Sequence, residues 1–427
     1  MNIRLYNAYI LNKEFEIEFG EVHIRGGKIA YIGNNPPKEA GWDRNIDMNN
    51  ALIMPGISNC HTHSPMTLLR SFSDDLSLHD WLNKAIFPIE SRMTPEDCYY
   101  GTLLAVLEYL SSGVTAIGDM YFYQGDIIQA CVDAGFKIAG VGSASDLAGD
   151  TQEQLEELER RYVKFNSYSP LCKYKLGFHA QYTASDNLVQ GVAKLAQKYK
   201  ADVCVHLSET KEEVQNCLKQ KGLTPPQYFA RKGVFDFGGS AYHCVHLNEK
   251  DIEVLKEKNV TVVTNPSSNL KLASGIADIE NYYKKGLKIA IGTDGAASNN
   301  SLDMLKEIYL TAVLAKVKNY NPAALPAKEV LKMAITNGAQ ALGFSKGIIE
   351  EGADADITAI SFDKPNMQPV NNIINNVVYS AASKNVVLTM INGKILYEKG
   401  EYNIGISPEK IYDYCNKAIK RLKQQAQ

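Results

Sequence analysis

Two histidines one residue apart, His61 and His63, follow a short apolar run that begins at Leu52. In an extended chain, residues i and i+2 lie on the same face of a strand, so both imidazoles can point at one ion while Thr62 points away. A His-x-His pair also arises by chance, and two packing or surface histidines are the alternative interpretation. The pair therefore predicts a metal site only in combination with further metal ligands later in the chain.

Further side chains that bind metals stand just after later apolar runs. They are His179, His206, His243 and Asp294. Three imidazoles and one carboxylate suit Zn²⁺ or a similar divalent ion that keeps one position open for water. The ligands that we predict for this ion are His61, His63, His206 and Asp294.

Two residues beside the predicted ion have the chemistry to assist a hydrolysis. A bound divalent ion lowers the pKa of its water from about 15.7 towards about 7, which gives a nucleophile at neutral pH. Glu209 leaves its strand three residues after His206, so it can move a proton from that water to the substrate. We expect His243 to hold the water or the developing oxyanion. Taken singly, a surface glutamate and a core histidine are the alternatives.

The middle of the chain predicts a fold that brings these residues together. Short apolar runs alternate with helical patterns, and the first run is the one before His61. The seven later runs are residues 114–117, 137–141, 174–178, 202–207, 241–247, 260–264 and 288–291. Eight strands, each followed by a crossover long enough for a helix, predict an α/β fold, a closed (β/α)8 TIM-like barrel rather than an open sheet. The carboxyl ends of such strands meet at one mouth, where we expect the candidate residues to lie.

Both ends of the chain are rich in short alternating strands and flank the barrel. Gly26-Gly27 and Asn392-Gly393 supply hairpin turns. We predict one small composite β-sandwich domain built from residues 1–52 and 351–427, with a barrel over 53–350. Its strands are expected to include residues 376–379, and its last helix to cover 408–427. Residues 64–92 lack periodicity and are expected to form a long functional loop, whose closure over substrate the sequence leaves open.

The composition is typical of a globular protein that acts on a small molecule. Hydrophobic residues make up 45% of the 427 residues, and the net charge of −3 gives no long-range attraction to nucleic acid or to an anionic membrane. The eight cysteines form no Cys-x-x-Cys pair, so we expect reduced thiols. No signal sequence or stretch of about 18 apolar residues is present. We therefore expect a cytoplasmic protein with a small-molecule substrate and neither a nucleic-acid nor a membrane partner; a homo-oligomer is compatible with the sequence.

Several motifs match the pattern of a known family. They are His61-Thr62-His63, His206-x-x-Glu209, residues 243–247, 265–272 and 292–300, and the turn at 352–356. Together they resemble the amidohydrolase superfamily, and more narrowly its methylthioadenosine/S-adenosylhomocysteine deaminase branch, which is related to the chlorohydrolase and guanine deaminase branches. The resemblance spans nearly the whole chain.

The resemblance implies one metal ion, usually Zn²⁺ with Fe²⁺ as the alternative, and hydrolytic loss of ammonia from C6 of an adenine ring. Glu209 would protonate the ring nitrogen beside C6, and Asp294 would accept a proton from the attacking water, so both would also face the substrate. By motif, Glu90 resembles the acid that grips the ribose hydroxyls, and His179 resembles a substrate-binding histidine. Trp81 offers an aromatic face to a substrate, with packing of its segment as the alternative.

The loop after the third barrel strand bears on the substrate. Residues 140–150 contain no Lys or Arg, whereas branch members that take S-adenosylhomocysteine tend to carry arginine there. Because an unpaired carboxylate is costly to desolvate, we expect methylthioadenosine, 5′-deoxyadenosine or adenosine to be favoured over S-adenosylhomocysteine. A deaminase or chlorohydrolase of a free base, a pterin or a triazine is the alternative. A catalytically silent relative is a further alternative.

Overall fold

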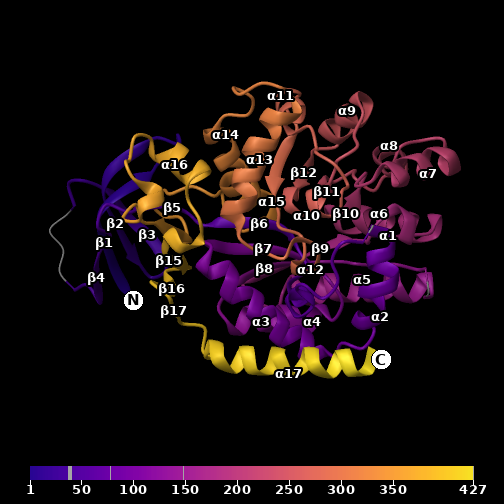
Figure 1. Ribbon diagram of the computed structural model, residues 1–427, viewed down its shortest axis with the longest axis horizontal. Helices are drawn as coiled ribbons and strands as arrows, with labels where there is room; N and C mark the ends of the chain where they lie inside the picture. The colour runs from indigo at the N-terminus through magenta and orange to yellow at the C-terminus, as the bar shows by residue number, and fades with distance from the viewer. Residues whose placement is uncertain (37–40, 77, 148, 427) are drawn as a thin grey trace.

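The computed structural model of the protein describes residues 1–36, 41–76, 78–147 and 149–426. Within these residues an eight-stranded parallel sheet forms the centre of the larger part of the molecule (Figure 1). Its strands are β6 (Ile57–Thr62), β7 (Val114–Met120), β8 (Lys137–Val141), β9 (Cys172–Gly177), β10 (Val203–Leu207), β11 (Gly239–His243), β12 (Val260–Thr264) and β13 (Lys288–Ile291). They are almost entirely buried, as expected of strands that are covered on both faces.

The barrel closes between its first and last strands. The backbone N–H groups of Thr293 and Asp294, just after β13, donate to the carbonyl of His61 at 3.1 and 2.9 Å. The side chain of Asn59 on β6 also accepts from the Thr293 N–H at 3.0 Å. These bonds fix Asp294 beside His61, so the closure of the barrel itself brings two of the predicted ligands together.

Helices follow the strands on the outside of the barrel. They are α3 (Pro95–Ser111), α4 (Gln124–Asp133), α5 (Thr151–Phe165), α6 (Asp186–Tyr199), α7 (Lys211–Lys221), α8 (Pro225–Arg231), α9 (Glu249–Glu257), α10 (Pro266–Lys271), α11 (Ile279–Lys284), α12 (Ala296–Asn299), α13 (Met304–Lys318), α14 (Ala327–Lys332), η4 (Met333–Asn337) and α15 (Gly338–Leu342). Their sequences define where several of them begin. Side chains at 94, 150, 185, 210 and 248 each accept the backbone N–H three residues later, which is the usual N-cap interaction.

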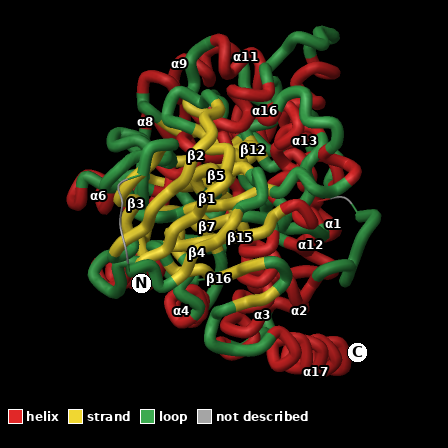
Figure 2. Tube along the Cα trace, turned by 90° about the vertical axis from the view of Figure 1, so that its left-hand side faces the viewer, coloured by secondary structure: helices red, strands yellow, loops and turns green. Residues whose placement is uncertain are grey.

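A second sheet combines both ends of the chain, and Figure 2 shows it face on. Its strands are β1 (Asn2–Leu11), β2 (Ile17–Arg25), β3 (Lys28–Gly33), β4 (Arg44–Asp47), β5 (Leu52–Pro55), β14 (Ile357–Ile360), β15 (Val386–Ile391), β16 (Lys394–Glu398) and β17 (Glu401–Tyr402). The two ends meet at β5, which pairs parallel with β1 and antiparallel with β14. The predicted fold class, a (β/α)8 barrel with a composite β domain, is confirmed.

The last helix, α17 (Pro408–Ala426), lies along the edge of the barrel beside α3 (Figure 1). Tyr414 stacks on Tyr100 of α3 with ring centroids 4.0 Å apart, and Arg421 forms an ion pair with Asp97. In the described part of the chain, no helix combines the length and the apolar character needed to cross a membrane. All eight cysteines are free and buried, as predicted.

Two local predictions are wrong. Residues expected as a strand at 376–379 belong to a helix, α16 (Ile373–Tyr379), because the side chain of Asn372 caps it by accepting the N–H of Asn375 at 2.9 Å. The expected loop at 64–92 contains short helical turns, namely η1 (Ser64–Leu69), α1 (Leu78–Asp80), η2 (Trp81–Ile86) and α2 (Phe87–Glu90). Turns this short leave no clear periodicity in the sequence. Three further short turns are η3 (Gln181–Thr183), η5 (Pro365–Met367) and η6 (Ser383–Asn385).

Candidate active site

The side chains predicted as metal ligands lie at the carboxyl end of the barrel strands and approach one another closely. Asp294 Oδ1 is 3.4 Å from His61 Nε2 and 3.0 Å from His63 Nε2. The ring centroids of His61 and His206 are 4.8 Å apart. Residues that are separated by more than two hundred positions in the sequence therefore meet around one point.

The donor set fits a divalent metal ion. Ligand atoms of His61, His63 and Asp294 lie within 4.8 Å of one another, and so do those of His61, His206 and His243. His61 is fully buried, and neither of its ring nitrogens makes a hydrogen bond to a residue that the structure describes, which is costly unless a cation takes a lone pair. Burial also lowers the pKa of His61 to about 3, so its imidazole is neutral, as a metal ligand must be.

The orientation of two imidazoles is fixed by backbone carbonyls. His206 Nδ1 donates to the carbonyl of His179 at 2.7 Å, and His63 Nδ1 donates to the carbonyl of Met120. Each bond places a proton on Nδ1 and turns Nε2 towards the site. Burial lowers the pKa of His63, but its contact with Asp294 raises that pKa overall to about 9, so an ion that binds His63 must displace a proton from Nε2. His206 is instead kept neutral, since burial holds its pKa well below the usual value.

Two serine hydroxyls hold the carboxylate of Asp294. Ser268 Oγ and Ser298 Oγ donate to Asp294 Oδ2 at 2.5 and 2.9 Å. Because Oδ2 is occupied in this way, the other oxygen, Oδ1, faces the histidines. One carboxylate can therefore contact both an ion and a water molecule beside it.

Glu209 and His243 form a pair on another side of the cluster. Glu209 is buried, with one oxygen accepting from Ser274 Oγ at 3.1 Å and the other 3.9 Å from His243 Nε2. His243 Nδ1 donates to Asn269 Oδ1 at 2.7 Å, so Nε2 faces the site. Burial raises the pKa of Glu209, which favours its protonated form. A proton donor thus lies beside the histidine cluster.

Glu90 lies close to the cluster at the end of α2. It is buried and accepts a hydrogen bond from Tyr121 OH at 2.5 Å, and the Tyr121 ring is 6.3 Å from that of His63. Burial raises the pKa of Glu90 to about 7. Since Glu90 forms no ion pair with any residue that the structure describes, its buried carboxylate is suited to accept hydrogen bonds from a ligand that displaces water.

His179 and Trp81, the remaining two residues predicted to bind substrate, lie in different surroundings from each other. The His179 ring lies 4.8 Å from that of His206, and its Nδ1 is 3.1 Å from Thr183 Oγ1, so it borders the cluster. Trp81 is only 5% exposed, packs in the main apolar core and donates its indole N–H to the carbonyl of Ser73 at 3.1 Å. Its indole is thus engaged by its own segment.

Sequence reasoning did not single out several residues that support the site. Ser268, Ser298 and Asn269 hold Asp294 and His243 as described above. Asp119 on β7 is fully buried and accepts the backbone N–H of Ser64 at 2.8 Å, and its other oxygen has no hydrogen-bond partner among the described residues. These residues all lie near the carboxyl ends of barrel strands. That position is the feature of the sequence from which they could have been predicted as part of the site.

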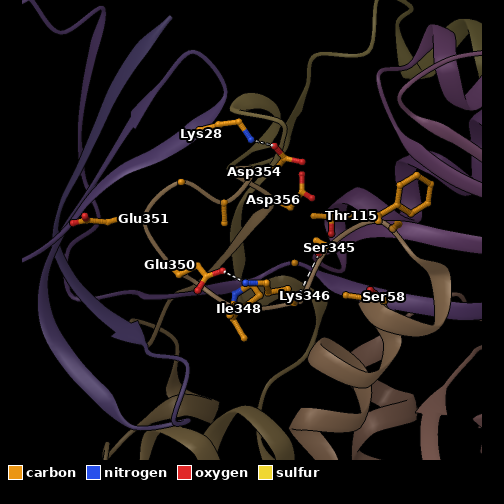
Figure 3. A pocket seen from close by; sticks show the side chains of 18 residues that line it. Lys28, Ser58, Thr115, Ser345, Lys346, Ile348, Glu350, Glu351, Asp354 and Asp356 are labelled. Atoms are coloured by element: carbon orange, nitrogen blue, oxygen red, sulfur yellow. Dashed lines mark hydrogen bonds and ion pairs between the residues drawn. The ribbon is translucent and has the colours of Figure 1, made fainter.

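A separate cavity of about 420 Å³ lies at the opposite end of the barrel, against the composite sheet (Figure 3). Four of its charged groups pair with one another: Lys28 with Asp354 and Lys346 with Glu350, each at 2.9 Å. Ser58, at the amino-terminal end of β6, is among its lining residues. The histidine cluster lies at the other end of the same strand, so this cavity is not the candidate active site.

Comparison with known proteins finds similar sequences and structures that cover nearly the whole chain. The sequence model described as "Amidohydrolase family" matches residues 52–396. A protein of Thermoanaerobacter pseudethanolicus named 5-methylthioadenosine/S-adenosylhomocysteine deaminase is 40% identical, with 99% of this chain and 100% of that protein covered. One of the same name from Caldanaerobacter subterraneus subsp. tengcongensis is 38% identical, with 99% of each covered. The crystal structure of an adenosine deaminase from Xanthomonas campestris with bound zinc has a TM-score of 0.93 and 30% identity, covering 99% of this chain and 98% of the other.

Proposed function

The chain belongs to the amidohydrolase family, and we propose that it is a hydrolytic deaminase that replaces the C6 amino group of adenine nucleosides by oxygen and releases ammonia. The observation that carries this proposal is the convergence of three histidines and Asp294 on one point with the buried carboxyl of Glu209 beside them. The names of the two bacterial relatives and of the structural neighbour support an adenine nucleoside as substrate.

We propose Zn²⁺ as the metal, with Fe²⁺ as the alternative. Three imidazoles and a carboxylate form a typical zinc ligand set, and the neighbouring adenosine deaminase structure contains zinc. We further propose a cytoplasmic location, which the eight free thiols support.

The proposed mechanism assigns one task to each residue. His61, His63, His206 and Asp294 would hold the zinc ion, which would supply a water of lowered pKa. Asp294 accepts a proton from the attacking water, and Glu209 protonates the ring nitrogen beside C6, so that C6 becomes more electrophilic. Because its ring proton lies on Nδ1, which donates to Asn269, His243 accepts a hydrogen bond from the attacking water at Nε2 and holds that water in place. The proton on Asp294 then passes to the leaving amine, the C6–N bond breaks and ammonia departs, while the C6 hydroxyl gives its proton to Glu209, which forms the carbonyl and restores the acid.

The loop after β8 supports a substrate without a carboxylate tail. Its Asp146 accepts hydrogen bonds from Ser185 Oγ at 2.5 Å and from Thr151 Oγ1 at 2.7 Å. Burial opposes ionisation, but these bonds lower the pKa of Asp146, so the loop carries a negative charge. A like charge disfavours a substrate carboxylate. We therefore propose methylthioadenosine, 5′-deoxyadenosine or adenosine rather than S-adenosylhomocysteine as the preferred substrate.

An ammonia-release screen of the zinc-loaded enzyme tests the function. We expect kcat/KM for the three favoured nucleosides to exceed that for S-adenosylhomocysteine by about tenfold or more, since each 1.4 kcal/mol of unfavourable desolvation corresponds to a factor of ten. Ammonia from guanine or a pterin, with none from adenine nucleosides, would favour the alternative substrate class. No ammonia from any compound, together with no bound metal, would indicate a silent relative.

Glu90→Gln should raise KM for adenosine by about 10- to 100-fold with a small effect on kcat, because a hydrogen bond to a charged group contributes about 1.5–3 kcal/mol. The matched control is 2′,3′-dideoxyadenosine, which lacks the hydroxyls that Glu90 is proposed to bind. Its KM should be similar for both enzymes in steady-state assays. An equal rise in KM for both nucleosides would remove the proposed ribose contact.

A further inference from the structure

Glu213 lies directly behind the turn that carries Glu209, and the proposed mechanism does not use it. It stands in the first turn of α7 and is only 5% exposed. Its two carboxylate oxygens accept the backbone N–H groups of Ser208 at 2.9 Å and of Glu209 at 2.8 Å. In the described part of the chain, Glu213 forms no ion pair with a basic side chain. Its interactions are therefore directed at the backbone of this turn.

The turn adopts a backbone conformation that needs support. Ser208 has a φ of +51°, in the left-handed region that costs a non-glycine residue free energy. Its carbonyl accepts the N–H of His246 at 2.9 Å, which fixes one side of the turn. Within the described ranges, the buried hydroxyl of Ser208 makes no hydrogen bond that would stabilise the turn. The N–H side of the turn is held by Glu213.

The position of Glu213 in its helix makes it a rigid anchor. Thr210 is the N-cap of α7, and its hydroxyl oxygen accepts the N–H of Glu213 at 3.1 Å. In a capping box, a glutamate at this position reaches back to the N-cap residue. Here the carboxylate reaches further, to the two residues before the cap. It thereby ties the start of α7 to the end of the loop that follows β10.

We propose that Glu213 is a positioning residue, which holds the Ser208–Glu209 backbone so that the Glu209 carboxyl points at the reacting atoms. Two hydrogen bonds to consecutive N–H groups fix the orientation of the peptide that joins these residues. A rotation at Ser208 would swing Glu209 away from Ser274 and His243. This inference rests on the proposed function of Glu209 as proton donor. A misplaced proton donor slows the chemical step more than it weakens substrate binding.

Glu213→Gln is the test, because glutamine keeps the size of the side chain while its NH₂ group cannot accept an N–H. We expect kcat for the best nucleoside to fall about 10- to 100-fold, KM to change less than about threefold and the metal content to stay at one ion per chain. The matched control is Glu280→Gln. Glu280 is also 5% exposed, in the first turn of α11, and accepts the N–H of Leu325 at 2.8 Å away from the cluster. This control should leave kcat within about twofold.

The inference is overturned if Glu213→Gln retains wild-type kcat, if it loses its metal, or if Glu280→Gln lowers kcat equally. Where Glu213→Gln does not fold, Glu213→Asp is the second variant. It keeps the charge but has a shorter side chain, and its kcat should fall in the same way but by a smaller factor.

Crystal structures of the wild type and of the variant give a test without substrate. We expect Ser208 to leave its left-handed conformation and Glu209 to separate from Ser274. An unmoved turn contradicts the inference, whereas a wild-type enzyme inactive on every nucleoside contradicts the proposed function only.

Discussion

Glu209→Gln should lower kcat for nucleoside deamination by about 10³-fold, since a positioned general acid or base contributes about 10²- to 10⁴-fold. Glutamine has nearly the same shape and can keep the contact with Ser274, but it cannot deliver a proton to the ring nitrogen. Substrate binding should change little, so KM should stay within a few-fold of the wild-type value. Steady-state ammonia release at saturating nucleoside measures the loss, and metal analysis should find one ion per chain in both proteins.

Glu212→Gln is the matched control for this prediction. Glu212 lies on the same helix as Glu213 but is exposed to solvent, and we expect its substitution to leave kcat unchanged. If Glu209→Gln retained more than about a tenth of wild-type kcat, the proton-transfer role assigned to it would be wrong, because the smallest effect expected of a general acid is about 10²-fold.

The candidate site could be located from the sequence because its residues follow simple local rules. His61 and His63 share a face through the two-residue period of a strand, and His206 and Asp294 stand at or after the ends of apolar runs. The barrel topology then places the ends of all strands at one mouth. The approach of Asp294 Oδ1 to within 3.0 Å of His63 follows from these two rules together with the closure of the barrel.

The supporting residues could not be predicted in the same way. Ser268 and Asp294 are 26 positions apart and touch only because β12 and β13 are neighbours. In the sequence, Glu213 is an ordinary acidic residue in the first turn of a helix. Its unusual feature is the left-handed turn at Ser208 before that helix, and no sequence pattern predicts this turn. Hydrogen bonds of this kind depend on side-chain directions in the folded protein.

Two segments show how local signals compete with tertiary structure. The pair Val377-Val378 favours a strand by its β-branched side chains, yet the cap at Asn372 and burial of both valines place them in α16. The contact of Trp81 with a substrate stays a prediction; its indole N–H donates to the carbonyl of Ser73 and its ring packs in the core. The residue types in these two segments are known from the sequence, but the direction in which each side chain points depends on packing in the folded protein.

Asp294→Ala should abolish both metal binding and activity. The carboxylate is the only acid among the predicted ligands, and its Oδ1 lies 3.4 and 3.0 Å from the Nε2 atoms of His61 and His63. Its removal takes away a ligand and the proposed proton acceptor together, so kcat/KM should fall by about 10⁴-fold or more, beyond the range of a single general-base effect.

Metal analysis and thermal unfolding of the same variant separate binding from chemistry. Because a ligand that binds only the folded state stabilises it, Zn²⁺ at 100 times its Kd should add about 2.7 kcal/mol to the unfolding free energy of the metal-free wild type, and clearly less to that of Asp294→Ala. Asp236→Asn, which removes an exposed partner of Lys258, is the control and should retain both the metal and the stabilisation. Full metal content in Asp294→Ala would show that the three histidines suffice, and the carboxylate would then keep only its proposed role as proton acceptor.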